Sequence, residues 1–320
     1  MNPRQTPNAQ RQTILVTGGA GFIGSNLAEA LVEEGHEVVI VDNLSTGRKE
    51  NIPQKAKFFE VDITQKNKLE EVFTEVKPEA VFHLAAQASV NNSIKDPVLD
   101  VKVNVIGTIN LLDLSGEHEV KHFIFSSTGG AIYGDDAPRP TPETANANPL
   151  TPYGIDKHQA EKFIEFYSKN APFKTVILRY ANVYGPKQDP LGEAGVVAIF
   201  TAKMLSGEPV TIYGDGEQSR DFVYVGDVVR ANLLALSAQS GGVYNIGSGV
   251  ETSVNDVAGI LKTATGSKSE IKHDSPRVEQ RNSLLDNRKA TLELDWKPEI
   301  ILEEGLKKTV RWYEEVNNEE

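Results

Sequence analysis

The side chains with the clearest capacity for chemistry are Tyr153 and Lys157, four residues apart in TPYGIDKHQAEKFIEFYSK. Thr151 suits a helix cap and Pro152 suits a first turn, so residues 151–169 are predicted to be helical. Residues four apart share one face of a helix. A free phenol, with a pKa of about 10, is a poor base at neutral pH, but a neighbouring ammonium group favours the phenolate. The pair is a candidate proton acceptor for an alcohol, although alone it is more commonly a coincidence of the surface.

A cluster of hydroxyl groups follows an apolar run in HFIFSSTGGAIYG. The run is predicted to be a buried strand that ends in Ser126, Ser127 and Thr128, and Gly129 and Gly130 come next. These hydroxyls either hydrogen-bond to the backbone where the strand ends or donate to the oxygen of a substrate.

The segment TGGAGFIG places Gly18, Gly21 and Gly24 between a predicted strand and a predicted helix. Without side chains the backbone can approach a pyrophosphate, and the helix start supplies free N–H groups. Asp42 ends the next predicted strand, 18 residues after Gly24, where a carboxylate binds ribose hydroxyls and favours NAD. Arg48 lies close by in the sequence and leaves NADP open as the cofactor.

The order of the predicted elements supplies a framework for these residues. Strands are predicted at 13–16, 38–41, 57–63, 80–86, 122–127 and 175–180, and helices at 22–34, 66–76, 97–115 and 151–169. Because apolar strands alternate with helices, we expect an α/β fold with a Rossmann-type, doubly wound parallel sheet covered on both faces.

The alternation gives way to Gly-rich polar loops after Asn182, which predicts a smaller α/β substrate-binding domain. We expect a disordered tail at 1–12, a dinucleotide-binding domain at 13–182 with about 222–247, and the smaller domain at 183–221 with 248–320.

The composition argues against several classes of protein. The net charge of −12 disfavours a nucleic acid or an anionic membrane as partner. The chain has no cysteine, so thiolate chemistry is impossible and a cytoplasmic location is expected. The six histidines lack metal-ligand spacing, so no metal site is expected, and His83 in a predicted strand is expected to be a packed residue. Asp215, Asp221 and Asp227 are interpreted as turn and cap residues.

Eight motifs stand in the order and spacing of a known family: TGGAGFIG, DNLSTG, VDI, HLAAQ, FSST, YGIDK, RYANVYGP and GDGEQSRDFVYVGDV. They resemble the extended short-chain dehydrogenase/reductase superfamily, and within it the UDP-glucose 4-epimerases. The resemblance implies that Tyr153 takes the proton of a UDP-sugar C4 hydroxyl while the C4 hydride passes to bound NAD. The 4-keto sugar then rotates and the hydride returns to its other face, which interconverts UDP-glucose and UDP-galactose. A homodimer paired through the helices at 97–115 and 153–169 is implied as well.

The resemblance also assigns individual site residues. The catalytic residues would be Thr128, Tyr153 and Lys157, with Ser127 as the alternative hydroxyl. The cofactor NAD would be bound by Gly18, Gly21, Phe22, Ile23, Gly24, Asp42, Asn43, Thr46, Gly47, Asp62, Ile63, Leu84, Ala85, Ala86, Asn104, Tyr153, Lys157 and Tyr180. The UDP-sugar would be bound by Thr128, Asn182, Val196, Val197, Arg220, Arg277 and Ser283.

Certain positions bear on the reaction and the substrate. Related 4,6-dehydratases carry an acidic pair after the threonine, whereas Gly129 and Gly130 cannot transfer protons, which favours epimerisation. Ser283 stands where some epimerases have a bulky tyrosine, so UDP-GlcNAc and UDP-GalNAc are expected substrates too. After Arg277 the sequence VEQR departs from the Gly-acid pattern of the family.

Alternatives to this function stay open at the level of sequence. One is a uronate 4-epimerase or decarboxylase of the same superfamily, which must accept a carboxylate at C6 of the sugar. The other is a catalytically silent NAD-binding regulator. Such regulators typically lose the tyrosine or the lysine, and this chain keeps both Tyr153 and Lys157.

Overall fold

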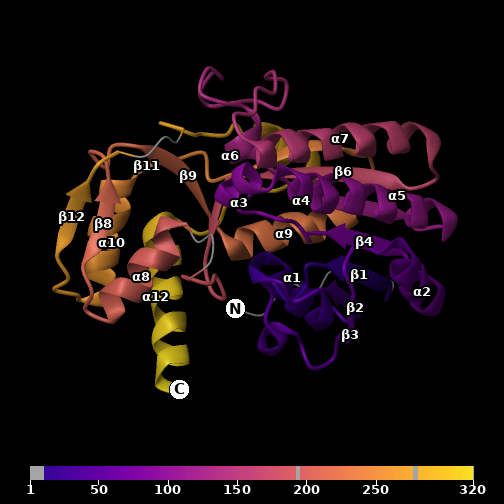
Figure 1. The fold of residues 1–320 in the computed structure, drawn as a ribbon, viewed down its shortest axis with the longest axis horizontal. Helices are drawn as coiled ribbons and strands as arrows, with labels where there is room; N and C mark the ends of the chain where they lie inside the picture. The colour runs from indigo at the N-terminus through magenta and orange to yellow at the C-terminus, as the bar shows by residue number, and fades with distance from the viewer. Residues whose placement is uncertain (1–10, 192–194, 277–279, 320) are drawn as a thin grey trace.

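The computed structural model describes residues 11–191, 195–276 and 280–319, and its centre is a seven-stranded parallel sheet (Figure 1). The strand order is β10 (Gly242–Ile246), β6 (Lys174–Tyr180), β5 (His122–Thr128), β4 (Ala80–His83), β1 (Thr13–Thr17), β2 (Glu37–Asp42) and β3 (Lys57–Glu60). The order reverses at β1, which is the arrangement of a doubly wound sheet, and the predicted fold class is confirmed.

Helices cover both faces of this sheet. One face packs against α1 (Phe22–Glu33), α9 (Val225–Leu236) and α11 (Arg288–Leu294), and the other against α2 (Lys66–Val76), α5 (Gly107–Glu117) and α7 (Pro152–Asn170). Within β1, Ile14 and Val16 join the core on the first face, and Leu15 joins the core on the second. Each such side chain contributes about 1.5–3 kcal/mol by leaving water. This two-sided burial explains why the strands are apolar throughout rather than alternating.

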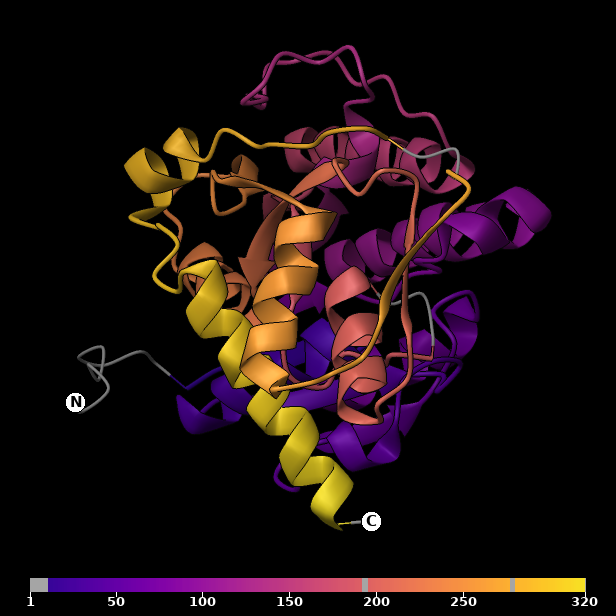
Figure 2. The same ribbon diagram turned by 90° about the vertical axis from the view of Figure 1, so that its left-hand side faces the viewer.

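A smaller lobe has a hydrophobic core of its own and lies on the left in Figure 1. It contains a three-stranded sheet of β11 (Glu251–Ser253), β9 (Ser219–Tyr224) and β7 (Asn182–Tyr184), and a parallel pair of β12 (Ile271–Asp274) and β8 (Val210–Tyr213). Its helices are α8 (Val196–Leu205), α10 (Val254–Thr265) and α12 (Leu302–Glu319). Figure 2 shows α8, α10 and α12 packed side by side on the face of this lobe that is turned toward the viewer.

The chain crosses between the two parts several times. β9 of the smaller lobe leads directly into α9, which packs on the large sheet, and β10 then adds to that sheet next to β6. Asp221 of β9 is fully buried and accepts hydrogen bonds from Ser248 and Gly249 of one loop and from Leu285 of another, so it ties two separate loops to β9. The structure therefore agrees with the prediction that Asp221 stabilises a turn, at Ser248 and Gly249, and adds a second contact, at Leu285.

Three local predictions need correction. The helix predicted at 97–115 consists of α4 (Pro97–Val101), a π-helical turn (Lys102–Ile106) and α5. The strand predicted at 57–63 ends at Glu60. Asp227 does not cap its own helix, because it lies inside α9 and accepts the backbone N–H groups of Glu299 and Ile300 instead.

Other local predictions are confirmed. Thr151 caps α7 by accepting the N–H of Gly154, and its side chain lies beside Pro152 at the first turn. His83 is a buried residue at the end of β4. Residues 1–10 of the predicted tail lie outside the described residues, whereas the carbonyl of Gln12 accepts the N–H of Glu37 beside the sheet.

Candidate active site

The glycine-rich turn after β1 is packed too closely for larger residues. Gly18 has a φ of +71°, and a Cβ atom on it would lie 2.6 Å from the backbone nitrogen of Ala85. A Cβ atom on Gly24 would lie 2.1 Å from the carbonyl oxygen of Gly18. Within the described part of the chain, no side chain caps α1 and its first turn contains no acid. The start of α1 therefore offers N–H groups and a positive dipole end to an anion, which fits the pyrophosphate of a dinucleotide.

Asp42 ends β2 beside this turn, as the prediction requires. Its carboxylate accepts the N–H groups of Ala20 at 3.0 Å and Leu44 at 2.8 Å, and the backbone of Gly47 packs against it. Burial raises the pKa of Asp42, although these two hydrogen bonds oppose the shift. Most of the predicted cofactor residues follow β1 to β4 at the same edge of the sheet: Gly18, Gly21, Phe22, Ile23, Gly24, Asn43, Thr46, Gly47, Asp62, Ile63, Leu84, Ala85 and Ala86.

Arg48, the residue that kept NADP as a possible cofactor, forms ion pairs with carboxylates in the structure. Its guanidinium donates to Asp189 at 2.9 Å and lies 3.9 Å from Glu50. A 2′-phosphate would have to compete with these acids and would face the negative charge of Asp42. The surroundings of Arg48 therefore fit NAD better than NADP.

A chain of hydrogen bonds links the glycine-rich turn to the π-helical turn through His83. The two ring nitrogens of His83 contact the hydroxyls of Thr17 at 2.8 Å and Thr108 at 2.9 Å. Thr108 in turn donates to the carbonyl of Asn104, and Thr17 accepts the N–H of Ala85. Complete burial lowers the pKa of His83, and the nearby Lys157 lowers it further, so the imidazole is neutral. A neutral ring accepts one of these hydrogen bonds and donates the other.

Lys157 is buried at the carboxyl end of β5. Only 3% of its surface is exposed, its ammonium donates to the carbonyl of Ser126 at 2.9 Å, and it lies 4.6 Å from the centre of the Phe125 ring. Burial lowers the pKa of Lys157 to about 8, although the charges of Glu161 and Asp100 act in the opposite direction. The ammonium group is thus held in place, and it loses its charge at a lower pH than an exposed lysine does.

The pKa of Tyr153 differs from the sequence-based expectation, which was a lowered value. The surrounding protein atoms raise its pKa, the charge of Asp100 adds to the shift, and Lys157 does not reverse it in the protein alone. Desolvation of a phenolate outweighs a single nearby ammonium group that is itself partly compensated. Ionisation of Tyr153 therefore requires a further positive charge beside the ring.

The hydroxyl cluster is divided between the two faces of β5. The Ser127 hydroxyl donates to Glu161 at 2.6 Å and is buried, whereas Thr128 is partly exposed on the opposite face. A Cβ atom on Gly130 would lie 3.9 Å from the Thr128 hydroxyl oxygen and 3.6 Å from the side-chain oxygen of Asn182. Thr128 and Asn182 are thus brought together, and Ser127 is used elsewhere.

A buried ion pair lies next to Ser127 of β5, and it was not predicted from the sequence. Glu161 and Arg179 form two hydrogen bonds, at 2.9 Å and 2.5 Å, and Arg179 also donates to Tyr133 at 2.7 Å. The Tyr133 phenol donates to Asn245 at 2.9 Å. Glu161 follows Lys157 by four residues, so the helical spacing alone was a signal for this neighbour.

The predicted substrate residues are placed at the border of the smaller lobe. Val196 and Val197 begin α8, and Arg220 lies in β9, where its guanidinium donates to the carbonyl of Ser219 at 2.9 Å. Ser283 is buried beside Ser219, its N–H donating to that residue's carbonyl at 3.1 Å. Arg277 lies outside the described residues.

Tyr180 and Asn104 of the predicted cofactor set have partners within the protein. The Tyr180 phenol is buried against Asn232 at 3.0 Å, so the structure gives it a packing role. The side chain of Asn104 makes two hydrogen bonds to the backbone of Gln87. Across residues 11–191, 195–276 and 280–319, no three His, Asp or Glu side chains gather in a way that could hold a metal ion. In the same ranges no helix combines the length and apolar character of a bilayer span.

The fold and the glycine-rich turn define a dinucleotide-binding α/β protein, and comparisons with known proteins identify its family. Residues 14–247 match the NAD dependent epimerase/dehydratase family. The chain is 47% identical over 95% of its length to a protein of Methanocaldococcus jannaschii named as a putative UDP-glucose 4-epimerase, 99% of which is covered.

Solved structures resemble the whole chain as well. The UDP-glucose 4-epimerase of Thermotoga maritima, solved with UDP-glucose, is 52% identical with a TM-score of 0.93, and covers 95% of this chain and 99% of its own. The Thermus thermophilus UDP-glucose 4-epimerase, solved with NAD, is 43% identical with a TM-score of 0.90, over 94% and 99% of the two chains. The protein belongs to the NAD-dependent epimerase/dehydratase family, it is an NAD-dependent epimerase, and the expected cofactor is confirmed.

Proposed function

We propose that the protein is a UDP-sugar 4-epimerase that interconverts UDP-glucose and UDP-galactose and also accepts their N-acetylated counterparts. The observation that carries the proposal is the placement of three groups at the carboxyl end of β5. Tyr153 and Lys157 share a face of α7, Lys157 is fixed to the end of β5, and Thr128 ends that strand on its accessible face. The glycine-rich turn opens at the same edge of the sheet.

Each of these side chains has a definite task in the proposed reaction. Tyr153 accepts the proton of the C4 hydroxyl, Thr128 donates a hydrogen bond to the C4 oxygen, and Lys157 holds positive charge beside the phenol. Bound NAD supplies the acceptor and return donor of the C4 hydride and, when oxidised, the further positive charge that Tyr153 requires. Gly18, Gly24 and Asp42 would hold that cofactor.

Two glycines support epimerisation over the elimination of water. Gly129 and Gly130 follow Thr128 without an acid or base. A Cβ atom on Gly129 would lie 2.5 Å from the Leu285 side chain, so a larger residue does not fit without rearrangement. A 4-keto sugar formed here therefore meets no acid or base at these two positions to drive the loss of water at C5 and C6.

The smaller lobe is proposed to bind the nucleotide end of the substrate. Arg220 supplies a guanidinium suited to a diphosphate, and Asn182 stands close to Gly130 on the sugar side. Ser283 carries a small side chain beside β9, at the position where some epimerases have a bulky tyrosine, which supports acceptance of an N-acetyl group at C2 of the sugar.

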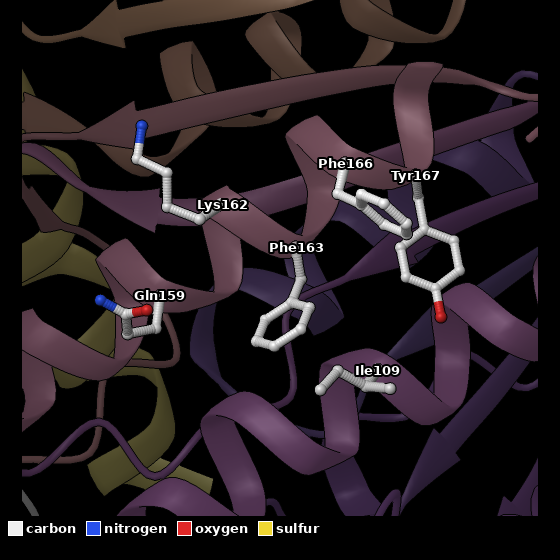
Figure 3. Close-up of a pocket in the computed structure, with 6 residues that line it drawn as sticks. All are labelled: Ile109, Gln159, Lys162, Phe163, Phe166 and Tyr167. Carbon is white, nitrogen blue, oxygen red and sulfur yellow. The ribbon is translucent and has the colours of Figure 1, made fainter. Parts of the chain in front are cut away.

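A homodimer is proposed through the exposed apolar face of α5 and α7. Figure 3 shows Phe163 and Phe166 of α7 and Ile109 of α5 lining a shallow apolar pocket. Phe166 is 61% exposed, and the neighbouring Ile106 and Ile155 are 44% and 45% exposed. Contiguous apolar surface of this kind marks an interface. A second copy of the same face would form a bundle of four helices.

Replacing Tyr153 by phenylalanine removes the proposed base without changing the packing. Tyr153→Phe should keep bound NAD and lower kcat for UDP-galactose by about 10²–10⁴-fold. The measurement is product identification by NMR with UDP-galactose, UDP-GalNAc and UDP-glucuronate as separate substrates. Tyr213→Phe in β8 is the matched control and should retain activity. Full activity of Tyr153→Phe would exclude the mechanism, and CO2 release or UDP-galacturonate formation by the wild type would favour the uronate alternative.

Substitution of Ser283 by tyrosine tests the proposed sugar specificity. Ser283→Tyr should lower kcat/KM at least tenfold for UDP-GalNAc while that for UDP-galactose changes much less, because the phenol fills the space proposed for the N-acetyl group. Ser283→Ala, which keeps the space open, is the control. Equal losses on both substrates, or no loss on either, would reject this role for Ser283.

A charge placed in the apolar face tests the dimer. Phe166→Glu should give a monomer in light scattering after size-exclusion chromatography, because the carboxylate would be desolvated between two copies. Leu292→Glu on α11, also a highly exposed position, is the matched control and should stay dimeric. A monomeric wild type, or a dimeric Phe166→Glu variant, contradicts the proposed interface.

A further inference from the structure

Two buried acids lie next to the proposed catalytic pair and have no role in the mechanism so far. Asp100 belongs to α4 and is fully buried, and Asp156 belongs to α7 and is 5% exposed. α4 and α7 pack against each other, and the two carboxyl groups lie within hydrogen-bonding reach. Such a contact between two acids is stable only if a proton lies between them.

The remaining hydrogen bonds of this pair point to the same conclusion. Among the described residues, the Oδ2 atoms of Asp100 and Asp156 are both buried without a donor. Two orphaned oxygen atoms on touching acids are both satisfied when one carboxyl group is protonated and donates to the other. The other oxygen of Asp100 accepts from the amide of Gln87, whose side chain also bonds to the backbone of Ser89.

The pair connects the catalytic helix to the loop that follows β4. Asp156 lies three residues after Tyr153 and next to Lys157, in the first turns of α7. Asp100 lies two residues before the π-helical turn, and that turn carries Asn104, which is hydrogen-bonded to the backbone of Gln87. A contact between the two acids thus fixes the start of α7 relative to the loop containing Gln87.

We propose that Asp100 and Asp156 share a single proton, and that this shared proton holds the start of α7, with Tyr153 and Lys157, in its catalytic position. The two acids are positioning residues, and their link to catalysis rests on the function proposed above for Tyr153. Loss of the proton places two carboxylates in contact, adds a negative charge near the phenol and disfavours its ionisation.

The charges around the pair are compatible with a protonated, neutral Asp156. The titratable or charged groups on the elements packed against α4 and α7 include Lys95 on α3 (Val90–Lys95), Asp96 and Asp100 at α4, Lys102 on the π-helical turn, Asp113 and Glu117 on α5, and His122, Lys174 and Arg179 on β5 and β6. Tyr153, Lys157, His158 and Glu161 lie on α7 itself, and His83 lies on the nearby β4. Lys95, Asp96 and Lys102 are exposed, and Glu161 is bound by Arg179. Burial, together with the hydrogen bond and charge of Asp100, raises the pKa of Asp156 to about 7.

The sign of the pH dependence follows from that raised pKa. The folded protein keeps the proton of Asp156 at pH values where the unfolded chain has lost it. The stability that the shared proton contributes is complete below about pH 4 and is lost as the pH rises through about 7. Replacement of Asp156 by asparagine removes this dependence, because its amide donates to Asp100 at every pH.

Asp156→Asn and Asp100→Asn test the proposal in the full-length protein, with Asp96→Asn as the control. Asp96 is exposed and caps α4, and asparagine also caps helices. The difference in Tm between pH 5.5 and pH 8.5 should be smaller in Asp156→Asn and Asp100→Asn than in the wild type and Asp96→Asn. Identical pH dependence of Tm in all four proteins would overturn the proposal.

A direct titration of the carboxyl groups separates this proposal from the proposed function, since it needs no turnover. In wild-type protein with carbon-13 in the aspartate carboxyl groups, one signal that disappears in Asp156→Asn or Asp100→Asn should titrate near pH 7. Titration of all aspartates below pH 5 would overturn the shared proton even if the enzyme is active. If the signal is found, kcat/KM of the wild type should fall relative to that of Asp156→Asn as the pH rises through about 7, because only the wild type gains a second negative charge near Tyr153. A constant ratio of the two kcat/KM values across this range would overturn the positioning role alone.

Discussion

The organisation of the site depends on the burial of one ammonium group, that of Lys157. A cation removed from water needs compensation, and the chain provides the carbonyl of Ser126, the face of the Phe125 ring and the fields of two carboxylates. The carboxylates come from Glu161, which is already paired with Arg179, and from Asp100, which accepts a hydrogen bond from the amide of Gln87. The compensation is therefore incomplete, which keeps the pKa of Lys157 below that of an exposed lysine.

This arrangement explains how the neighbouring elements are built. Glu161 is bound by Arg179 of β6 and by Ser127, so β5, β6 and α7 meet in one buried network. Because side chains alternate along β5, the strand gives Ser127 to that network and leaves Thr128 on the open face. The site therefore gains its hydroxyl and its fixed lysine from the same short stretch of parallel sheet.

Much of this architecture can be predicted from the sequence, because it depends on local patterns. Apolar strands alternating with helices define the doubly wound sheet, and the glycines at Gly18 and Gly24 indicate the close contacts found after β1. What the sequence does not reveal depends on contacts between distant residues. Asp227 binds a loop about seventy residues further on, and Asp100 meets Asp156 only because α4 packs on α7. The raised pKa of Tyr153 reflects desolvation by the surrounding protein and the charge of Asp100, which residue spacing does not report.

The pKa of Lys157 provides the most direct test of this account. Protein labelled with carbon-13 at the lysine ε carbon can be titrated by NMR, with the Lys157 signal assigned by its absence in Lys157→Arg. The account predicts a pKa of about 8 for Lys157, below that of the exposed lysines. A pKa at or above about 10.4, the ordinary value for lysine, would contradict it, because the ammonium group would then be neither desolvated nor incompletely compensated.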